Sequence, residues 1–160
     1  SACCMFAELA AWAADRGMSI YQLLQQVFVE YGLYKDQGVS VVRKGKSGAE
    51  EIEAMMKNFR ENPLKTLAGS PVVEVLDYAK LQGLWLDKGE VFTLDMPTTS
   101  NVLQYKTADG TKVSIRPSGT EPKIKFYIGV RGKVTSKDDL PAAEAACLEK
   151  IQVIRQELGI

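Results

Sequence analysis

The chain has no histidine and only three cysteines among its 160 residues. Because histidine is the commonest general base near neutral pH, its absence excludes Ser-His and Cys-His nucleophile pairs within the chain and weighs most against hydrolases. Cys3, Cys4 and Cys147 have none of the spacings of a zinc site, and adjacent residues such as Cys3 and Cys4 point in different directions on a helix. We therefore expect three buried free thiols and no metal site.

An excess of charge of either sign is also lacking, since 20 Lys and Arg balance 20 Asp and Glu. This balance argues against the broad electrostatic surface that binds nucleic acid or an anionic membrane. No apolar run approaches the ~20 residues that a membrane span requires, and no signal peptide is recognisable. We expect a cytoplasmic protein without nucleic-acid or membrane partners, in which any anion site is local.

Two helices are expected at the N-terminus. Apolar side chains recur at helical spacing from Ala2 to Arg16, and Gly17 offers a stop. Ser19 and Gln22 then have capping-box spacing ahead of a second helix. The apolar stripe of that helix, for which we expect core packing, consists of Ile20, Leu23, Leu24, Val27, Phe28 and Tyr31. Since the chain begins with Ser inside a helical pattern, we also expect it to be a fragment of a longer protein.

The remainder reads as a strand, a helix, four strands and a helix. The segment 34–38 is expected to be a linker before a strand at 39–42, and the basic segment 43–46 a solvated strand end. A capping box at Ser47 and Glu50 opens the first helix, and a second one at Ser136 and Asp139 opens the last. The segment Leu84-Trp85-Leu86 is expected to be irregular or a short extension.

The Asp109-Gly110 pair is the strongest turn signal in the chain, and strands are expected on both sides of it, at 102–107 and 111–116. From 123 to 131, apolar residues alternate with Lys123, Lys125, Tyr127 and Arg131, so Lys125 should lie away from the core. Hairpin connections of this kind predict an α+β fold: a mainly antiparallel sheet of four to five strands with two helices on one face, preceded by the N-terminal helical hairpin.

The segment between these last strands has the composition of a phosphate cradle. Arg116 offers a planar fork of donors, Ser118 and Thr120 add hydroxyl groups, and Gly119 allows a close approach of backbone N–H groups. Pro117 and Pro122 bracket the segment and restrict its backbone, which would preorganise these donors. The residue types alone are equally compatible with an ordinary solvated turn.

The run RPSGTEPKIKFYI resembles the phosphate-binding loop of the α-D-phosphohexomutases, the phosphoglucomutase and phosphomannomutase family. In that family the loop belongs to the fourth and last domain and grips the phosphate of the sugar. The resemblance assigns this role to Arg116, Ser118, Gly119 and Thr120, and gives Lys125 a further basic position. The family often has Arg at this last position, so Lys125 keeps the charge but loses a bidentate donor.

The resemblance also implies a domain division and a reaction. Residues 1–34 would be the tail of the third domain, and residues 35–160 the C-terminal domain, whose sheet is of the TATA-box-binding-protein-like type. Family members interconvert hexose 1-phosphate and hexose 6-phosphate through a phosphoserine and a hexose 1,6-bisphosphate intermediate, with Mg²⁺ neutralising charge. The chain has no recognisable phosphoserine loop and no Asp-x-Asp-x-Asp metal loop, and Asp87, Asp95 and Asp109 are expected to be solvated.

We therefore expect the fragment to supply substrate grip and no catalytic residue, and to be inactive alone. Its partners would be the phosphosugar, the upstream domains and, through exposed N-terminal helices, a second copy of itself. One alternative is a free-standing module that binds a phosphate or phosphosugar without catalysis. Nucleic-acid binding through the sheet is a further alternative, which conflicts with the neutral charge.

Overall fold

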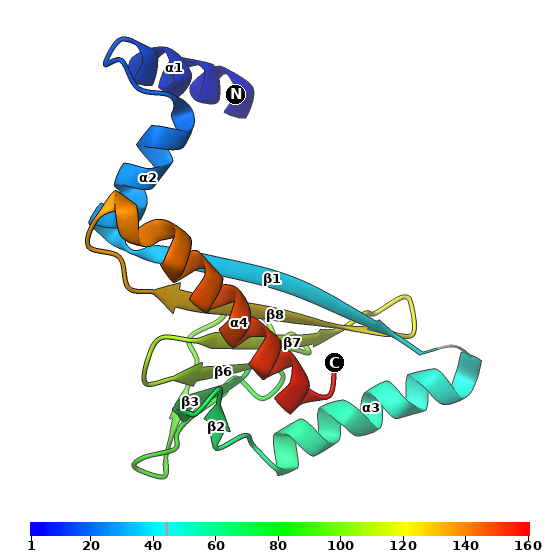
Figure 1. Ribbon diagram of the computed structural model, residues 1–160. Helices are drawn as coiled ribbons and strands as arrows, with labels where there is room; N and C mark the ends of the chain where they lie inside the picture. The colour runs from blue at the N-terminus through cyan, green and yellow to red at the C-terminus, as the bar shows by residue number, and fades with distance from the viewer. Residues whose placement is uncertain (44) are drawn as a thin grey trace.

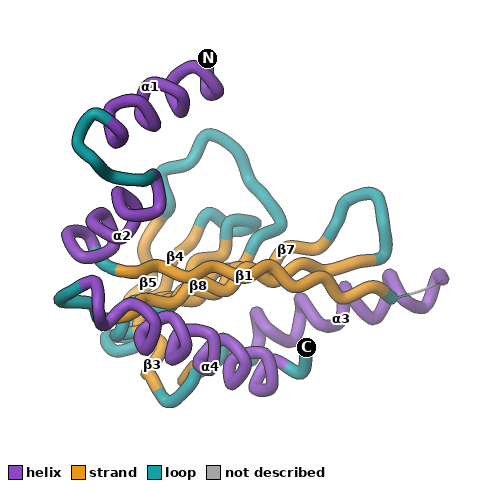
Figure 2. Tube along the Cα trace, turned by 45° about the horizontal axis from the view of Figure 1, so that its top comes forward, coloured by secondary structure: helices purple, strands orange, loops and turns teal. Residues whose placement is uncertain are grey.

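The computed structural model describes residues 1–43 and 45–160 and has an α+β architecture, as predicted. An antiparallel sheet carries α3 (Gly45–Glu61) and α4 (Leu140–Leu158) on the same side, as Figure 2 shows. The helices α1 (Ala2–Ala14) and α2 (Ile20–Tyr31) form an arm at one end of the molecule, with α1 standing clear of the sheet (Figure 1).

The sheet has eight strands, more than the four to five predicted. In spatial order they run β1-β8-β7-β6-β3-β4-β5, with β2 paired to β3. Their bounds are β1 Leu33–Val42, β2 Thr66–Leu67, β3 Ser70–Asp77, β4 Gln82–Trp85, β5 Glu90–Thr93, β6 Leu103–Thr107, β7 Lys112–Pro117 and β8 Lys123–Gly132.

Alternation along the central strands produces the core. On β8 the side chains of Ile124, Phe126, Ile128 and Val130 are buried beneath the two helices, because every second residue of a strand faces the same side. Phe126 meets Phe59 of α3 edge to face at 6.1 Å between ring centroids. The core from α4 consists of Leu140, Cys147, Ile151, Ile154 and Leu158. The opposite side of the sheet, which we call the outer face, carries the polar residues of β8.

The hairpin and the capping box predicted in the C-terminal half are both confirmed. The strands β6 and β7 pair around the Asp109-Gly110 turn, where Gly110 adopts a φ of 85° that favours glycine. Ser136 and Asp139 form a capping box on the 3₁₀ turn Lys137–Asp139 that leads into α4. Hydrogen bonds from the hydroxyl and N–H of Thr135 and from the N–H of Ser136 lower the pKa of Asp139 to about 2.

The linker predicted at 34–38 is wrong, since these residues lie inside the strand β1. They pair with β8 without interruption, from Leu33 opposite Gly132 to Val42 opposite Lys123. The segment at 84–86, expected to be irregular or a short extension, largely belongs to a separate strand, β4, which pairs with both β3 and β5. In both cases the pairing partner, and not local sequence, determines the structure.

Two expectations for the N-terminal arm are also wrong. Cys147 is buried, but Cys3 and Cys4 are exposed, because they lie on α1, which stands clear of the sheet (Figure 1). The core packing expected for the α2 stripe is not found, since α2 has no buried residue, whereas the exposed N-terminal helices expected of a fragment are; the capping box at Ser19 is formed. Phe28 alone of the stripe packs against the sheet's core.

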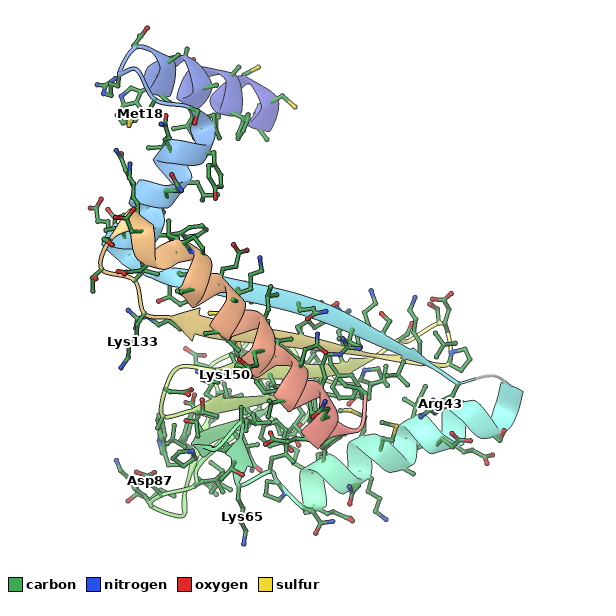
Figure 3. All side chains as sticks on the ribbon, viewed as in Figure 1. Met18, Arg43, Lys65, Asp87, Lys133 and Lys150 are labelled. Carbon is green, nitrogen blue, oxygen red and sulfur yellow. The ribbon has the colours of Figure 1, made fainter. Side chains whose placement is uncertain are left out.

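Part of the basic segment 43–46 lies outside the described residues, namely Lys44 and the side chain of Lys46. Arg43 is exposed, as predicted for a strand end, and its Nε lies 3.2 Å from a carboxylate oxygen of Glu51 on α3. Figure 3 shows Arg43 at the end of β1 that leads into this helix.

Candidate functional site

The predicted cradle is the loop at 118–122, which connects β7 and β8. It projects from the end of the sheet opposite the N-terminal arm (Figure 1). The two strands hold its base in register, with Arg116 opposite Lys125 and Pro117 opposite Ile124. Since Ile124 is fully buried in the core, Arg116 and Lys125 emerge together on the outer face. Their side chains therefore start from neighbouring backbone positions on one side of the loop.

Internal hydrogen bonds hold the loop in shape. The N–H of Ser118 donates to the carbonyl of Lys123 at 2.8 Å, and the N–H of Lys123 donates to the carbonyl of Glu121 at 2.7 Å. The Ser118 hydroxyl oxygen accepts from the N–H groups of Thr120 (3.4 Å) and Glu121 (3.3 Å). Ser118 thus braces the turn with its lone pairs, while its hydroxyl proton is free to point outward.

A contact to β1 adds to this support, since the N–H of Arg43 donates to the carbonyl of Pro122 at 2.9 Å. Gly119 has space around it: a Cβ built there would have no heavy atom within 4 Å, and its φ is not in the left-handed region. The turn itself does not require glycine at this position. What glycine leaves is open space beside the backbone, where a ligand could approach closely.

The outer side of the loop borders a cavity of about 450 Å³. Its lining includes all five residues predicted to bind phosphate, namely Arg116, Ser118, Gly119, Thr120 and Lys125. The same cavity is also lined by Glu121, Lys123 and Tyr127, which the sequence analysis did not assign to a site. The alternation along β8 could have indicated Lys123 and Tyr127, because both are two residues away from Lys125 and therefore share its face of the strand.

The charges around this cavity favour an anion. Three cations, from Arg116, Lys123 and Lys125, face one carboxylate, that of Glu121. Glu121 forms an ion pair with Lys123. A hydrogen bond from Lys123, and then the charges of Lys123 and Lys125, lower the pKa of Glu121, so it remains a carboxylate near neutral pH.

A second, larger cavity of about 790 Å³ lies on the other side of the loop, against α3. Its cations include Arg60, whose guanidinium already donates to Asp77 (Nε–Oδ2 3.1 Å) and to Asn101 (2.6 Å). Glu53 and Glu61 add negative charge to the same walls. With its charges mixed and Arg60 engaged, this cavity is less suited to a phosphate than the one on the outer face.

Within residues 1–43 and 45–160, no three acidic, histidine or cysteine side chains gather in a way that could hold a metal ion, so the donor set does not fit a Mg²⁺ site. The helices of the described chain are all too short or too polar to cross a membrane. Asp109 is exposed to solvent, as expected, but it also accepts hydrogen bonds from Thr107 and Thr111 and pairs with Lys150.

Comparisons with known proteins agree on one family. Residues 39–146 match the family model described as phosphoglucomutase/phosphomannomutase, C-terminal domain. A phosphoglucomutase of Staphylococcus haemolyticus is 32% identical over 116 residues, which cover 72% of this chain and 21% of that protein. A phosphoglucomutase of Staphylococcus aureus is 34% identical over 115 residues, covering 72% of this chain and 20% of that protein.

A solved structure is also similar, that of the phosphoglucomutase pp63/parafusin from Paramecium in its open form. It is 15% identical, with a TM-score of 0.42, and the match covers 89% of this chain and 24% of that one. The present chain thus spans about a fifth of the length of the curated relatives it matches. The family model begins within β1 and leaves α1 and α2 outside its range.

Proposed function

This chain belongs to the phosphoglucomutase/phosphomannomutase family as its C-terminal domain, and from this premise we propose that the cavity on the outer face binds the phosphate group of a phosphosugar. The observation that carries the proposal is the convergence of Arg116, Ser118, Gly119, Thr120 and Lys125 on one cavity. Arg116 would make a bidentate contact, Lys125 would supply a second charge, and the two hydroxyls and loop N–H groups would complete the shell.

The preformed loop supports this proposal on energetic grounds. Because Ser118, the β7–β8 pairing and the contact from Arg43 already fix the backbone, little conformational entropy remains to be lost when an anion binds. Binding energy gained at the phosphate, remote from the reacting hydroxyl, can then orient the sugar for reaction.

We further propose that the full-length protein is a cytoplasmic mutase that interconverts hexose 1-phosphate and hexose 6-phosphate through a hexose 1,6-bisphosphate. The phosphoserine and the Mg²⁺ site would come from upstream domains of the same polypeptide, of which residues 1–34 would be the last part. Mg²⁺ would neutralise the charge of the transferred phosphoryl group there. This chain's own residues would hold the non-reacting phosphate in place.

The alternative is a free-standing module that binds phosphate or a phosphosugar without chemistry. The two proposals differ in what precedes Ser1. A mutase requires an upstream serine loop, an acidic metal loop and a sugar-recognition loop in the coding sequence, and a free-standing module requires none of them.

Phosphate binding can be tested directly on the 160-residue chain by titration with inorganic phosphate and glucose 6-phosphate, followed by two-dimensional NMR. We expect shifts of the loop amides, and binding of both ligands at least about tenfold weaker in Arg116→Ala, since a charge-assisted hydrogen bond is lost. Arg131→Ala is the matched control, because Arg131 lies on the outer face of β8 but outside the cavity. Equal affinities for the wild type and Arg116→Ala would refute the proposed site.

The same chain should have no mutase activity by itself. Incubation with glucose 1-phosphate, glucose 1,6-bisphosphate and Mg²⁺ is expected to produce no glucose 6-phosphate above the buffer background, because the chain lacks a recognisable phosphoserine loop. Turnover by the isolated chain would show that catalytic groups are present in it and would contradict this division of labour.

A further inference from the structure

The ion pair between Lys123 and Glu121 lies inside the proposed phosphate cavity, and neither residue is among the five proposed to bind phosphate. Lys123 is the first residue of β8 and lies two positions before Lys125, on the same side of the strand. Its side chain is 28% exposed and that of Glu121 is 60% exposed. The cavity therefore holds a third cation whose present partner is a carboxylate on the loop itself.

Lys123 can readily exchange the Glu121 carboxylate for a more strongly charged partner. An ion pair at an exposed position gains little, because water and salt screen the attraction and two side chains must be held in place. A phosphate ester near neutral pH carries close to two negative charges and three strong acceptor oxygens. It therefore offers the ammonium group of Lys123 more negative charge and more acceptor oxygens than one exposed carboxylate does. The flexible four-carbon stem of lysine allows the ammonium group to turn from one partner to the other.

We propose that Lys123 is an additional phosphate-binding residue and that Glu121 competes with the bound phosphate for its ammonium group. The proposal rests on the proposed function of the cavity and deepens it. When phosphate enters, Lys123 leaves Glu121 for a phosphate oxygen, and when phosphate leaves, the pair forms again. A competing carboxylate limits how tightly the phosphate is held, which suits a site that must release a phosphosugar in every catalytic cycle.

The carboxylate of Glu121 is not needed to hold the loop. The turn is closed by backbone hydrogen bonds between Ser118 and Lys123 and between Lys123 and Glu121, and by the hydroxyl of Ser118. The charged groups that face the Glu121 carboxylate across the cavity are Lys123, Lys125 and Arg116. Neutralising Glu121 should therefore leave the fold intact and change the balance of charges in the cavity.

The test is a set of NMR titrations of the full 160-residue chain with inorganic phosphate, at pH 7 and physiological salt. Glu121→Gln should bind about three- to fivefold more tightly than the wild type, the scale of an exposed ion pair. Lys123→Gln should bind at least about fivefold more weakly, because it loses a charge-assisted hydrogen bond. In the Lys123→Gln background, Glu121→Gln should have an effect below about twofold, because its competition acts through Lys123.

Two control variants remove the same charges from the outer face outside the cavity. Asp36→Asn on β1 and Lys112→Gln on β7 should leave the affinity within about twofold of the wild type, since screening weakens charges beyond ~8 Å. A second readout is the pKa of Glu121, measured by NMR, which should rise in Lys123→Gln because its main hydrogen-bond donor is gone.

The outcomes separate this proposal from the proposed function. If Arg116→Ala weakens phosphate binding but Glu121→Gln binds no more tightly than the wild type, the cavity binds phosphate and the competition is refuted. If Lys123→Gln binds as tightly as the wild type, Lys123 is not a phosphate ligand. If neither Arg116→Ala nor Lys123→Gln changes the affinity, both the site and the competition fail.

Discussion

At Gly119, a substitution should affect ligand binding without lowering stability. A methyl group at this position would have no heavy atom within 4 Å and no unfavourable φ to contend with. Gly119→Ala should therefore leave the thermal midpoint unchanged or slightly raised. Alanine reduces the conformational entropy of the unfolded chain, which stabilises the folded state by up to ~1 kcal/mol. The added methyl group would occupy the wall of the proposed phosphate cavity, which Gly119 lines, so affinity for inorganic phosphate should fall. Calorimetry and titration of the same variant measure both effects, and a lower midpoint with unchanged affinity would contradict this view.

At the residue scale, the identity of the candidate site residues could be predicted from the sequence, but most of their contacts could not. Arg116 and Lys125 are nine residues apart in the chain, and their cross-strand pairing follows once the loop is recognised as a connection between strands. The Glu121–Lys123 pair could not be predicted, because it depends on how the loop turns back on itself. The second role of Ser118, as acceptor for two loop N–H groups, depends on the same turn.

At the element scale, Asp109 joins the β6–β7 hairpin to α4. One carboxylate oxygen accepts from the hydroxyls of Thr107 (2.6 Å) and Thr111 (2.9 Å), and the other pairs with Lys150 on α4, labelled in Figure 3. Burial raises the pKa of Asp109, but the hydrogen bonds from Lys150, Thr107 and Thr111 outweigh it and hold the pKa far below its usual range. The side chain is 42% exposed, so solvent screening reduces the net contribution.

Asp109→Ala should therefore lower the free energy of unfolding by about 1 kcal/mol at pH 7. Because the pKa is lowered in the folded state, this contribution is fully present above the unfolded pKa of ~4 and is lost progressively as the pH falls from there through the folded pKa. Urea denaturation at pH 7 and pH 3 measures the difference, which should narrow at pH 3. Asp87→Ala, an exposed carboxylate on the β4–β5 turn, is the control and should have no comparable effect. A constant difference at both pH values would contradict the assignment.

The strand β1 shows why some elements escaped prediction. Tyr34, Asp36 and Gly38 gave no apolar run, and strand propensity reflects the neighbours that a strand meets. Those neighbours are on β8, some ninety residues later, where Tyr34 faces Arg131 and Gly38 faces Tyr127. The helices and the Asp109-Gly110 hairpin were predictable because caps, apolar stripes and turn residues are local signals. The cap predicted at Ser47 is wrong, however, since α3 already begins at Gly45.

At the scale of the whole molecule, the N-terminal arm is the part least supported by its surroundings. Met5, Phe6, Leu24 and Val27 are between 40% and 71% exposed, and they line an apolar groove formed by α1 and α2. Exposed apolar surface of this kind favours association. We expect the isolated chain to self-associate as its concentration rises, and removal of residues 1–18 to abolish this while leaving the sheet folded. Analytical ultracentrifugation and circular dichroism test both points, and a strictly monomeric full chain would contradict them.

The central proposal, that the outer-face cavity grips the phosphate of a phosphosugar, is tested most directly by the kinetics of Arg116→Ala in the proposed full-length mutase. A lost charge-assisted hydrogen bond of ~1.5–3 kcal/mol predicts a fall in kcat/KM for the phosphosugar of about ten- to a hundredfold. Arg116→Lys should recover only part of it, because the bidentate fork is missing, and Arg131→Ala should leave kcat/KM unchanged. A folded Arg116→Ala enzyme with kcat/KM within about twofold of the wild type, a difference below ~0.5 kcal/mol, would contradict the account.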